Sequence, residues 1–235
     1  MLPIWKLLGF ILYIVLYFSL FEPYDKWPPS SLKSNFFKVL PVAHLILVIV
    51  STSTEEEYHT KSRAYRRFIT LGLMFSVAGS SILWDYFRLG TMLFAVAQAL
   101  YILAFGFRPL GSGPMAASFG VIGTAVYVYV VTDLKEDTGL KALLLVYTVL
   151  ILVMAWRATA QFSRNMTVEN FCGCAGAALF VVSDLILVVD KWKGSFHHAP
   201  FCNMMTYFIA QVGIALSACN TRERKFYSHV VEKNK

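Results

Sequence analysis

One carboxylate, that of Asp184, lies within an apolar run from Cys172 to Val189 that contains no basic residue. By insertion scales, a charged side chain at the centre of a membrane-spanning helix costs about 2.5–3.5 kcal/mol. Such a residue usually faces a protein interior or a water-filled cavity, where it takes part in function. We therefore predict that Asp184 does chemistry. The alternative is a buried carboxylate that only pairs with a neighbouring helix.

Other polar side chains are expected at a depth similar to that of Asp184. Ser80 and Asp184 each lie about 8–9 Å from the end of an apolar segment, at 1.5 Å per residue. Each polar residue has an ordinary structural explanation, because lysine extends its ammonium toward the membrane surface and glutamine bonds across helices. Their shared depth instead predicts one cavity, lined by Lys38, Ser80, Gln98, Asp184 and Gln211, with Tyr101 and Tyr207 beside it.

The elements that must position these residues are membrane helices. The chain has 235 residues, 57% hydrophobic and only 15% charged, whereas a soluble domain carries about 25% charged residues. Crossing ~30 Å of hydrocarbon takes about 20 residues. We predict an all-α, polytopic membrane helix bundle of about eight transmembrane helices, with the second segment the shortest. The apolar segments are 4–21, 37–51, 66–84, 91–107, 114–132, 139–157, 171–189 and 200–219.

The basic residues favour one orientation of this bundle. Thirteen of the 21 lysines and arginines lie at the N-terminus, in the second, fourth and sixth loops, and in the C-terminal tail. Cytoplasmic loops carry the excess of such residues, so both termini are expected to be cytoplasmic. We predict a single transmembrane domain, residues 1–220, and a polar cytoplasmic tail, residues 221–235. Because the positive charges lie between helices, they do not indicate nucleic-acid binding.

The sequence offers no convergent set of metal ligands. Cys172 and Cys174 fall within one helix, and their spacing supplies no further ligands. His197 and His198 are expected to be a solvated pair in a loop. We therefore expect no metal and no cofactor.

Short stretches distributed over residues 33–220 match one known family in their order and spacing. They are Lys38 to Pro41, Leu73 to Gly79, Leu93 to Tyr101, Ala104–Phe105, Met154 to Ala158, Ser183 to Leu185, Thr206 to Gln211, and Ser217. In these stretches the chain resembles the lysoplasmalogenase family, the YhhN-like multi-pass transmembrane proteins.

The resemblance implies an enzyme that hydrolyses the vinyl ether bond of a lysophospholipid, the lysoplasmalogen, to a fatty aldehyde and a glycerophospho-base. It implies that Asp184 takes the place of one of two family aspartates thought to be catalytic. The second family aspartate corresponds to Ser80 here, and a family histidine corresponds to Gln98. The resemblance also implies a location in the endoplasmic reticulum or another endomembrane.

The two differences from the family, Ser80 and Gln98, fall within the predicted site. Vinyl ether hydrolysis requires a proton on carbon, followed by addition of water to the resulting oxocarbenium ion. Two carboxyl groups can divide these tasks, one as acid and one as base. Ser80 can orient a water molecule but cannot replace the second carboxyl group as a proton relay.

Three functions remain open from the sequence. The prediction is a lysoplasmalogenase, impaired by Ser80, in which Asp184 and Ser80 are catalytic. Its substrate-binding residues are Lys38, Gln98, Tyr101, Tyr207 and Gln211. The alternative is a catalytically inactive membrane protein that binds lysolipid or regulates a partner. A proton-coupled transporter that uses Asp184 is disfavoured, because the chain has no pair of Gly/Pro-broken helices of the kind that marks transporter sites.

Overall fold

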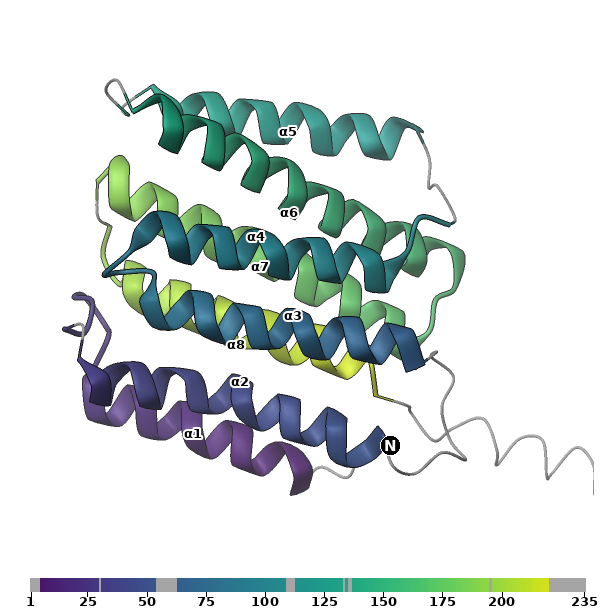
Figure 1. Cartoon of the computed structure of the whole chain (residues 1–235), viewed down its shortest axis with the longest axis horizontal. Helices are drawn as coiled ribbons and strands as arrows, with labels where there is room; N and C mark the ends of the chain where they lie inside the picture. The colour runs from purple at the N-terminus through teal and green to yellow at the C-terminus, as the bar shows by residue number, and fades with distance from the viewer. Residues whose placement is uncertain are drawn as a thin grey trace, which may run out of the picture.

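The computed structural model describes residues 5–29, 31–53, 63–108, 113–132, 134, 137–194 and 196–219. This part of the chain forms eight α-helices, each antiparallel to the one before it (Figure 1). The predicted all-helical class is confirmed, while the predicted tail, 221–235, lies outside the described residues. The helices are α1 (Trp5–Phe21), α2 (Leu32–Ser53), α3 (Arg63–Ile82), α4 (Phe87–Phe105), α5 (Gly113–Val131), α6 (Thr138–Arg164), α7 (Val168–Trp192) and α8 (Ala199–Ser217).

Six helices of the described chain are long and apolar enough to cross a membrane: α2, α4, α5, α6, α7 and α8. The apolar helix α1 has only 17 residues. Helix α3 carries Arg63, Arg66 and Arg67 near its start, which lowers its hydropathy. The protein is thus an integral, multi-pass membrane protein in which α1 and α3 complete the bundle.

The prediction that the second segment is the shortest is wrong. Helix α2 has 22 residues, whereas α1 has 17. The difference arises because α2 begins at Leu32, in a polar turn that an apolar count omits. The Ser31 hydroxyl oxygen accepts a hydrogen bond from the Ser34 backbone N–H at 3.1 Å, as a helix N-cap does.

The bundle has a central group of helices with one pair on either side (Figure 1). Helices α3, α4, α7 and α8 form the centre, α1 and α2 lie on one side, and α5 and α6 lie on the other. The central helices contribute fully buried aromatic side chains, including Tyr101, Phe180 and Phe208. Helix α5 is peripheral, since Gly123 and Val130 are its only buried residues.

Helices α7 and α8 touch backbone to backbone. A Cβ atom on Gly176 would lie 2.7 Å from the Ala210 carbonyl oxygen and 2.7 Å from the Ile214 nitrogen. Glycine permits this approach, which is common at helix interfaces in membranes. Further along the same interface, the Asn203 amide donates to the Ser183 carbonyl oxygen at 2.6 Å. The position of the residue after Ser183, Asp184, is therefore determined by both contacts.

Hydrogen bonds and ion pairs connect the segment between α1 and α2 to neighbouring segments at the end of the bundle where α2 begins. The Trp27 indole N–H donates to Asp190 Oδ2 at 2.7 Å, and Asp25 Oδ1 accepts from the His198 backbone N–H at 3.2 Å. The Nδ1 atoms of His197 and His198 each lie 3.1 Å from that same Asp25 oxygen. The exposed histidine pair therefore has a carboxylate partner in addition to solvent. Together these contacts join the α1–α2 connection to the last turn of α7 and to the α7–α8 connection.

Helix α6 begins with a side-chain cap at the same end of the bundle. Asp137 accepts a hydrogen bond from the Leu140 backbone N–H at 2.9 Å, and Arg88 donates to the other carboxylate oxygen at 2.5 Å. These two donors hold the pKa of the Asp137 carboxyl below its ordinary value. The exposed ion pair links the beginning of α4 to the beginning of α6.

Gly176→Ala is expected to destabilise the protein, because the added methyl group would meet backbone atoms of α8. Overpacking of this kind costs about 1–3 kcal/mol. Thermal unfolding of the detergent-solubilised protein measures the loss. Gly120→Ala is the matched control, since a Cβ atom on Gly120 meets nothing within 4 Å. Equal melting temperatures for the two variants would contradict the close contact between α7 and α8.

Candidate functional site

A cavity lies at the end of the bundle where α2, α4, α6 and α8 begin. It encloses about 650 Å³, counting its open mouth. Four of the predicted site residues line it: Lys38, Ser80, Asp184 and Tyr207. The other lining residues are Trp27, Leu83, Trp84, Phe87, Thr91, Phe94, Leu144, Tyr147, Ser183, Leu187, Val188, Asn203 and Met204.

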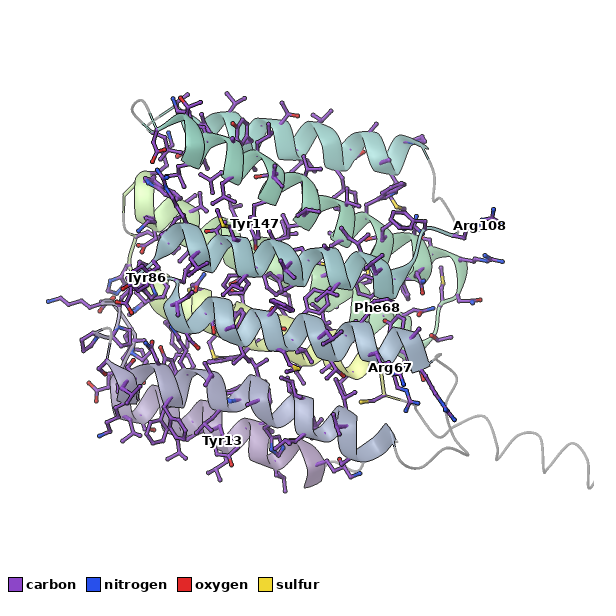
Figure 2. The ribbon with its side chains drawn as sticks, viewed as in Figure 1. Tyr13, Arg67, Phe68, Tyr86, Arg108 and Tyr147 are labelled. Atoms are coloured by element: carbon purple, nitrogen blue, oxygen red, sulfur yellow. The ribbon has the colours of Figure 1, made fainter. Side chains whose placement is uncertain are left out.

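The Asp184 carboxylate is bound by a tyrosine that the sequence analysis did not select. The Tyr147 hydroxyl donates a hydrogen bond to Asp184 Oδ2. Tyr147 lies on α6, which packs against α4 and α7 (Figure 2). The feature of the sequence that could have identified Tyr147 is a phenol in the middle of the apolar run Leu143 to Val153. Only the pairing with Asp184 distinguishes it from other aromatic residues of the membrane helices.

Ser80 lines the same cavity as Asp184 without touching it through a hydrogen bond. Its hydroxyl donates to the Val77 carbonyl oxygen of its own helix at 3.0 Å. The Tyr207 hydroxyl lies beside Ser80, and also lies 3.5 Å from the Ser76 carbonyl oxygen. Ser80 and Tyr207 therefore form a pair of hydroxyl groups that line the same cavity as the Asp184–Tyr147 pair.

Lys38 brings a positive charge to the cavity. Its side chain is only 7% exposed although it is formally charged. The carboxylate of Asp85, in the connection between α3 and α4, is its electrostatic neighbour. Rings of Trp27 and Trp84, with centroids 4.4 Å apart, lie on the same wall of the cavity and give its mouth an aromatic lining.

Gln98, Tyr101 and Gln211 lie behind the wall of the cavity and are not among its lining residues. All three are fully buried. The Tyr101 hydroxyl donates to Gln211 Oε1 at 3.2 Å. Gln98 lies next to the Tyr147 hydroxyl, and Gln211 lies next to that of Tyr207. The two glutamines therefore lie against the phenols that face the cavity, and Tyr101 bonds to one of these glutamines.

Gln98 was expected to line the cavity, and its depth in α4 explains why it does not. Helix α4 begins at Phe87, so Gln98 is about three turns into the helix, deeper than the apolar segment 91–107 suggests. Its two amide atoms have no hydrogen-bond partner in the part of the chain that the structure describes. A buried amide of this kind has donors and an acceptor available to a neighbouring polar group.

The chemical groups of the cavity suit proton transfer. One carboxyl group, two phenols, one ammonium, one amide and several hydroxyls face a space whose other walls are mostly apolar. A carboxyl group can donate and accept protons, and a phenol that donates to it can hold its orientation. The ammonium of Lys38 can attract an anionic group near the mouth.

Comparison with known proteins gives one family. The YhhN family model matches residues 34–218. Lysoplasmalogenase TMEM86A of Bos taurus is 34% identical over 231 residues, which cover 93% of this chain and 90% of that protein. Lysoplasmalogenase TMEM86B of Homo sapiens is 30% identical over 214 residues, which cover 89% of this chain and 84% of that protein. No solved structure matches the chain.

The family match includes α3 to α8 in full and most of α2. It also includes all seven predicted site residues, from Lys38 to Gln211. The resemblance found in the sequence is therefore confirmed: the chain belongs to the YhhN family.

Proposed function

We propose that this protein is a membrane-embedded lysoplasmalogenase that hydrolyses the vinyl ether bond of lysoplasmalogens. The observation that carries the proposal is the hydrogen bond from Tyr147 to Asp184 on the wall of a cavity that Lys38 and Ser80 also line. Relatives named lysoplasmalogenase, 27–34% identical over most of the chain, support the same reaction.

The reaction consumes one water molecule. Protonation of the vinyl carbon remote from the ether oxygen produces an oxocarbenium ion. Water then adds to the carbon next to that oxygen and loses a proton, which gives a hemiacetal. The hemiacetal breaks its bond to the glycerol oxygen, so that a fatty aldehyde leaves and the glycerophospho-base regains a hydroxyl group.

Asp184 acts first as the acid and then as the base. Because Tyr147 donates to Oδ2, the carboxyl proton resides on Oδ1, from which it passes to the vinyl carbon. The resulting carboxylate accepts a proton from the attacking water and returns to its initial state. General acid–base catalysis of this kind contributes typically 10²–10⁴-fold.

Ser80 orients the attacking water and supplies no proton relay. Its position corresponds to a second aspartate in the family, so this chain works with one carboxyl group and is slower than relatives that have two. Lys38 binds the phosphate of the lysophospholipid near the aromatic mouth. Tyr207 contacts the substrate, while Gln98 packs beside Tyr147, Gln211 packs beside Tyr207, and Tyr101 bonds to Gln211.

The second candidate is a lysolipid-binding protein without catalysis. Ser80, in place of a carboxyl group, is the observation that favours it. Purified protein incubated with a lysoplasmalogen separates the two candidates. Aldehyde release above the background of the Asp184→Asn variant supports the enzyme, while saturable binding without aldehyde supports the second candidate.

The proposed location is an endomembrane such as the endoplasmic reticulum, with both termini cytoplasmic. With an even number of antiparallel helices, the start of α1 and the end of α8 lie at the same end of the bundle (Figure 1). The excess of basic residues at this end favours the cytoplasm.

Tags at the two termini are expected to be equally accessible to protease added to the cytoplasmic side of sealed membrane vesicles. A tag in the connection between α7 and α8 is the control and should be protected. Protection of one terminus alone would exclude the eight-pass arrangement.

Asp184→Asn is expected to lower the rate of aldehyde release by roughly 10²–10⁴-fold, because the amide cannot deliver a proton. Tyr147→Phe removes the hydrogen bond to the carboxylate that forms as Asp184 gives up its proton, and should cost roughly 10- to 100-fold, the value of one bond to a charged group. Asp137→Asn and Tyr129→Phe, both at exposed positions away from the cavity, are the controls. Full activity of Asp184→Asn at normal expression would exclude a catalytic role.

Ser80→Asp is expected to raise activity, since it restores a second carboxyl group to the cavity. The gain should reach about tenfold even if the new group recovers only part of a general-base contribution. Kinetics are compared with those of Ser80→Asn, which has a similar size and no acid, and expression of both variants is measured. If Ser80→Asp gains nothing over wild type while wild type matches its relatives, one carboxyl group suffices.

A further inference from the structure

The Asp184–Tyr147 pair separates two cavities of different character. The second cavity lies between α5, α6 and α7 and has a volume of about 680 Å³, counting the part that is open to the surroundings. Both cavities are lined by Leu144, Tyr147, Asp184 and Val188. The hydrogen-bonded carboxyl group therefore belongs to a wall that the two cavities share.

Apart from the shared Asp184, the second cavity lacks the ammonium and amide groups that line the first. Its lining is mostly aliphatic, and no lysine, arginine, asparagine or glutamine is among the described residues that line it. The Tyr127 hydroxyl donates to the Lys141 carbonyl oxygen at 3.2 Å, so its polar end is occupied. The residues that line it besides the shared four are Ile122, Gly123, Val126, Tyr127, Val130, Thr148, Ile151, Leu152, Val181 and Leu185.

A groove between α5 and α6 adjoins the second cavity, and Leu152 packs against Gly123 where the two meet. Gly123, Tyr127, Thr148 and Leu152 line both spaces. The groove extends as far as Trp156 and also contacts Ala116, Phe119, Gly120, Thr124, Leu145, Val149 and Val153. We call the second cavity and this groove together the alkyl path.

The alkyl path has the length and the exposure that a single lipid chain requires. Nine residues separate Tyr147 from Trp156 on α6, which is about 14 Å at 1.5 Å per residue. One leaflet is about half of the ~30 Å hydrocarbon thickness. Helix α5 lies at the edge of the bundle (Figure 1), and its Val121 and Ile122 are 70% and 57% exposed. The helix that forms one side of the path therefore faces the lipid.

We propose that the alkyl path holds the alkenyl chain of the lysophospholipid while the Lys38 cavity holds its phosphate-bearing headgroup. The vinyl ether bond joins these two parts of the molecule, so it lies at the shared wall, beside Asp184 and Tyr147. This inference rests on the proposed function, since it assigns the substrate's two halves to the two sides of that site.

The path contributes more to aligning the substrate than to the affinity for its alkenyl chain. Lipid tails are as apolar as the side chains of the path, so moving a chain from the bilayer into it gains little free energy. Fixing the chain instead sets the position of the vinyl carbon relative to the carboxyl group. Misplacement of a reacting atom by about 1 Å can cost 10²-fold in rate. A side chain that blocks the path should therefore affect long-chain substrates most.

The first test maps the chain by photocrosslinking. The probe is a saturated alkyl-ether lysophospholipid with a diazirine at the chain end, which has no vinyl ether bond to hydrolyse. Wild-type protein in nanodiscs is irradiated, and the modified residues are identified by mass spectrometry. We expect modification of α5 and α6 near Phe119, Val149 and Trp156, reduced by excess unlabelled alkyl-ether lysophospholipid. Modification spread over the lipid-facing perimeter, such as Leu71 and Met74, would overturn the proposal.

The second test blocks the path. Thr148→Phe places a large ring in the segment common to the second cavity and the groove, and should reduce chain-end crosslinking about tenfold. Val146→Phe is the control, since Val146 is on the same helix, 55% exposed and absent from the lining. Equal crosslinking by the two variants would overturn the proposal. If Thr148→Phe fails to fold, the wild-type map still decides.

The two tests separate this inference from the proposed function. Aldehyde release by wild type together with crosslinks outside α5 and α6 would overturn the path and leave the enzyme intact. Crosslinks on the path without aldehyde release would support the chain site and count against catalysis. Thr148→Phe is further expected to lower kcat/KM for a long-chain lysoplasmalogen about tenfold and to leave that for a short-chain one near wild type.

Discussion

A carboxyl group in the interior of a membrane bundle must have a hydrogen-bonding partner, and the structure around Asp184 meets this requirement. By insertion scales, such a group costs about 2.5–3.5 kcal/mol at the centre of a helix. The Tyr147 hydroxyl on α6 donates to it across the interface with α7. The polar side chains of the site lie around this pair. Lys38, Ser80 and Tyr207 face the same cavity, while Gln98 contacts Tyr147 from behind.

The pair is only as well positioned as the helices that carry it. Gly176 allows α7 to approach the backbone of α8, and further along the interface the Asn203 amide donates to the Ser183 carbonyl oxygen. Because the second contact involves the residue immediately before Asp184, a shift between α7 and α8 moves the carboxyl group directly. Packing at a glycine remote from the cavity therefore affects the geometry of the site.

The site also lies at a chemical boundary that matches its proposed substrate. A lysophospholipid is an amphiphile, and its vinyl ether bond joins the polar part to the chain. Around Asp184, a cavity with an ammonium and an amide meets a mostly aliphatic one along a shared wall. Ser80 belongs to the polar side. A carboxyl group at this position would therefore bear on the handling of water and leave the alkyl path unchanged.

The amino-acid sequence determined the helical class, the approximate positions of the helices and the inward location of Asp184. These follow from hydrocarbon thickness and from the cost of exposing a charge to lipid, which act on each segment separately. Tertiary structure decided that Tyr147 is the partner of Asp184 and that Gln98, Tyr101 and Gln211 lie behind the cavity wall. Helices such as α6 are apolar on nearly every face, so hydropathy does not specify which face turns inward. Contacts with neighbouring helices determine that rotation, and no single segment contains them.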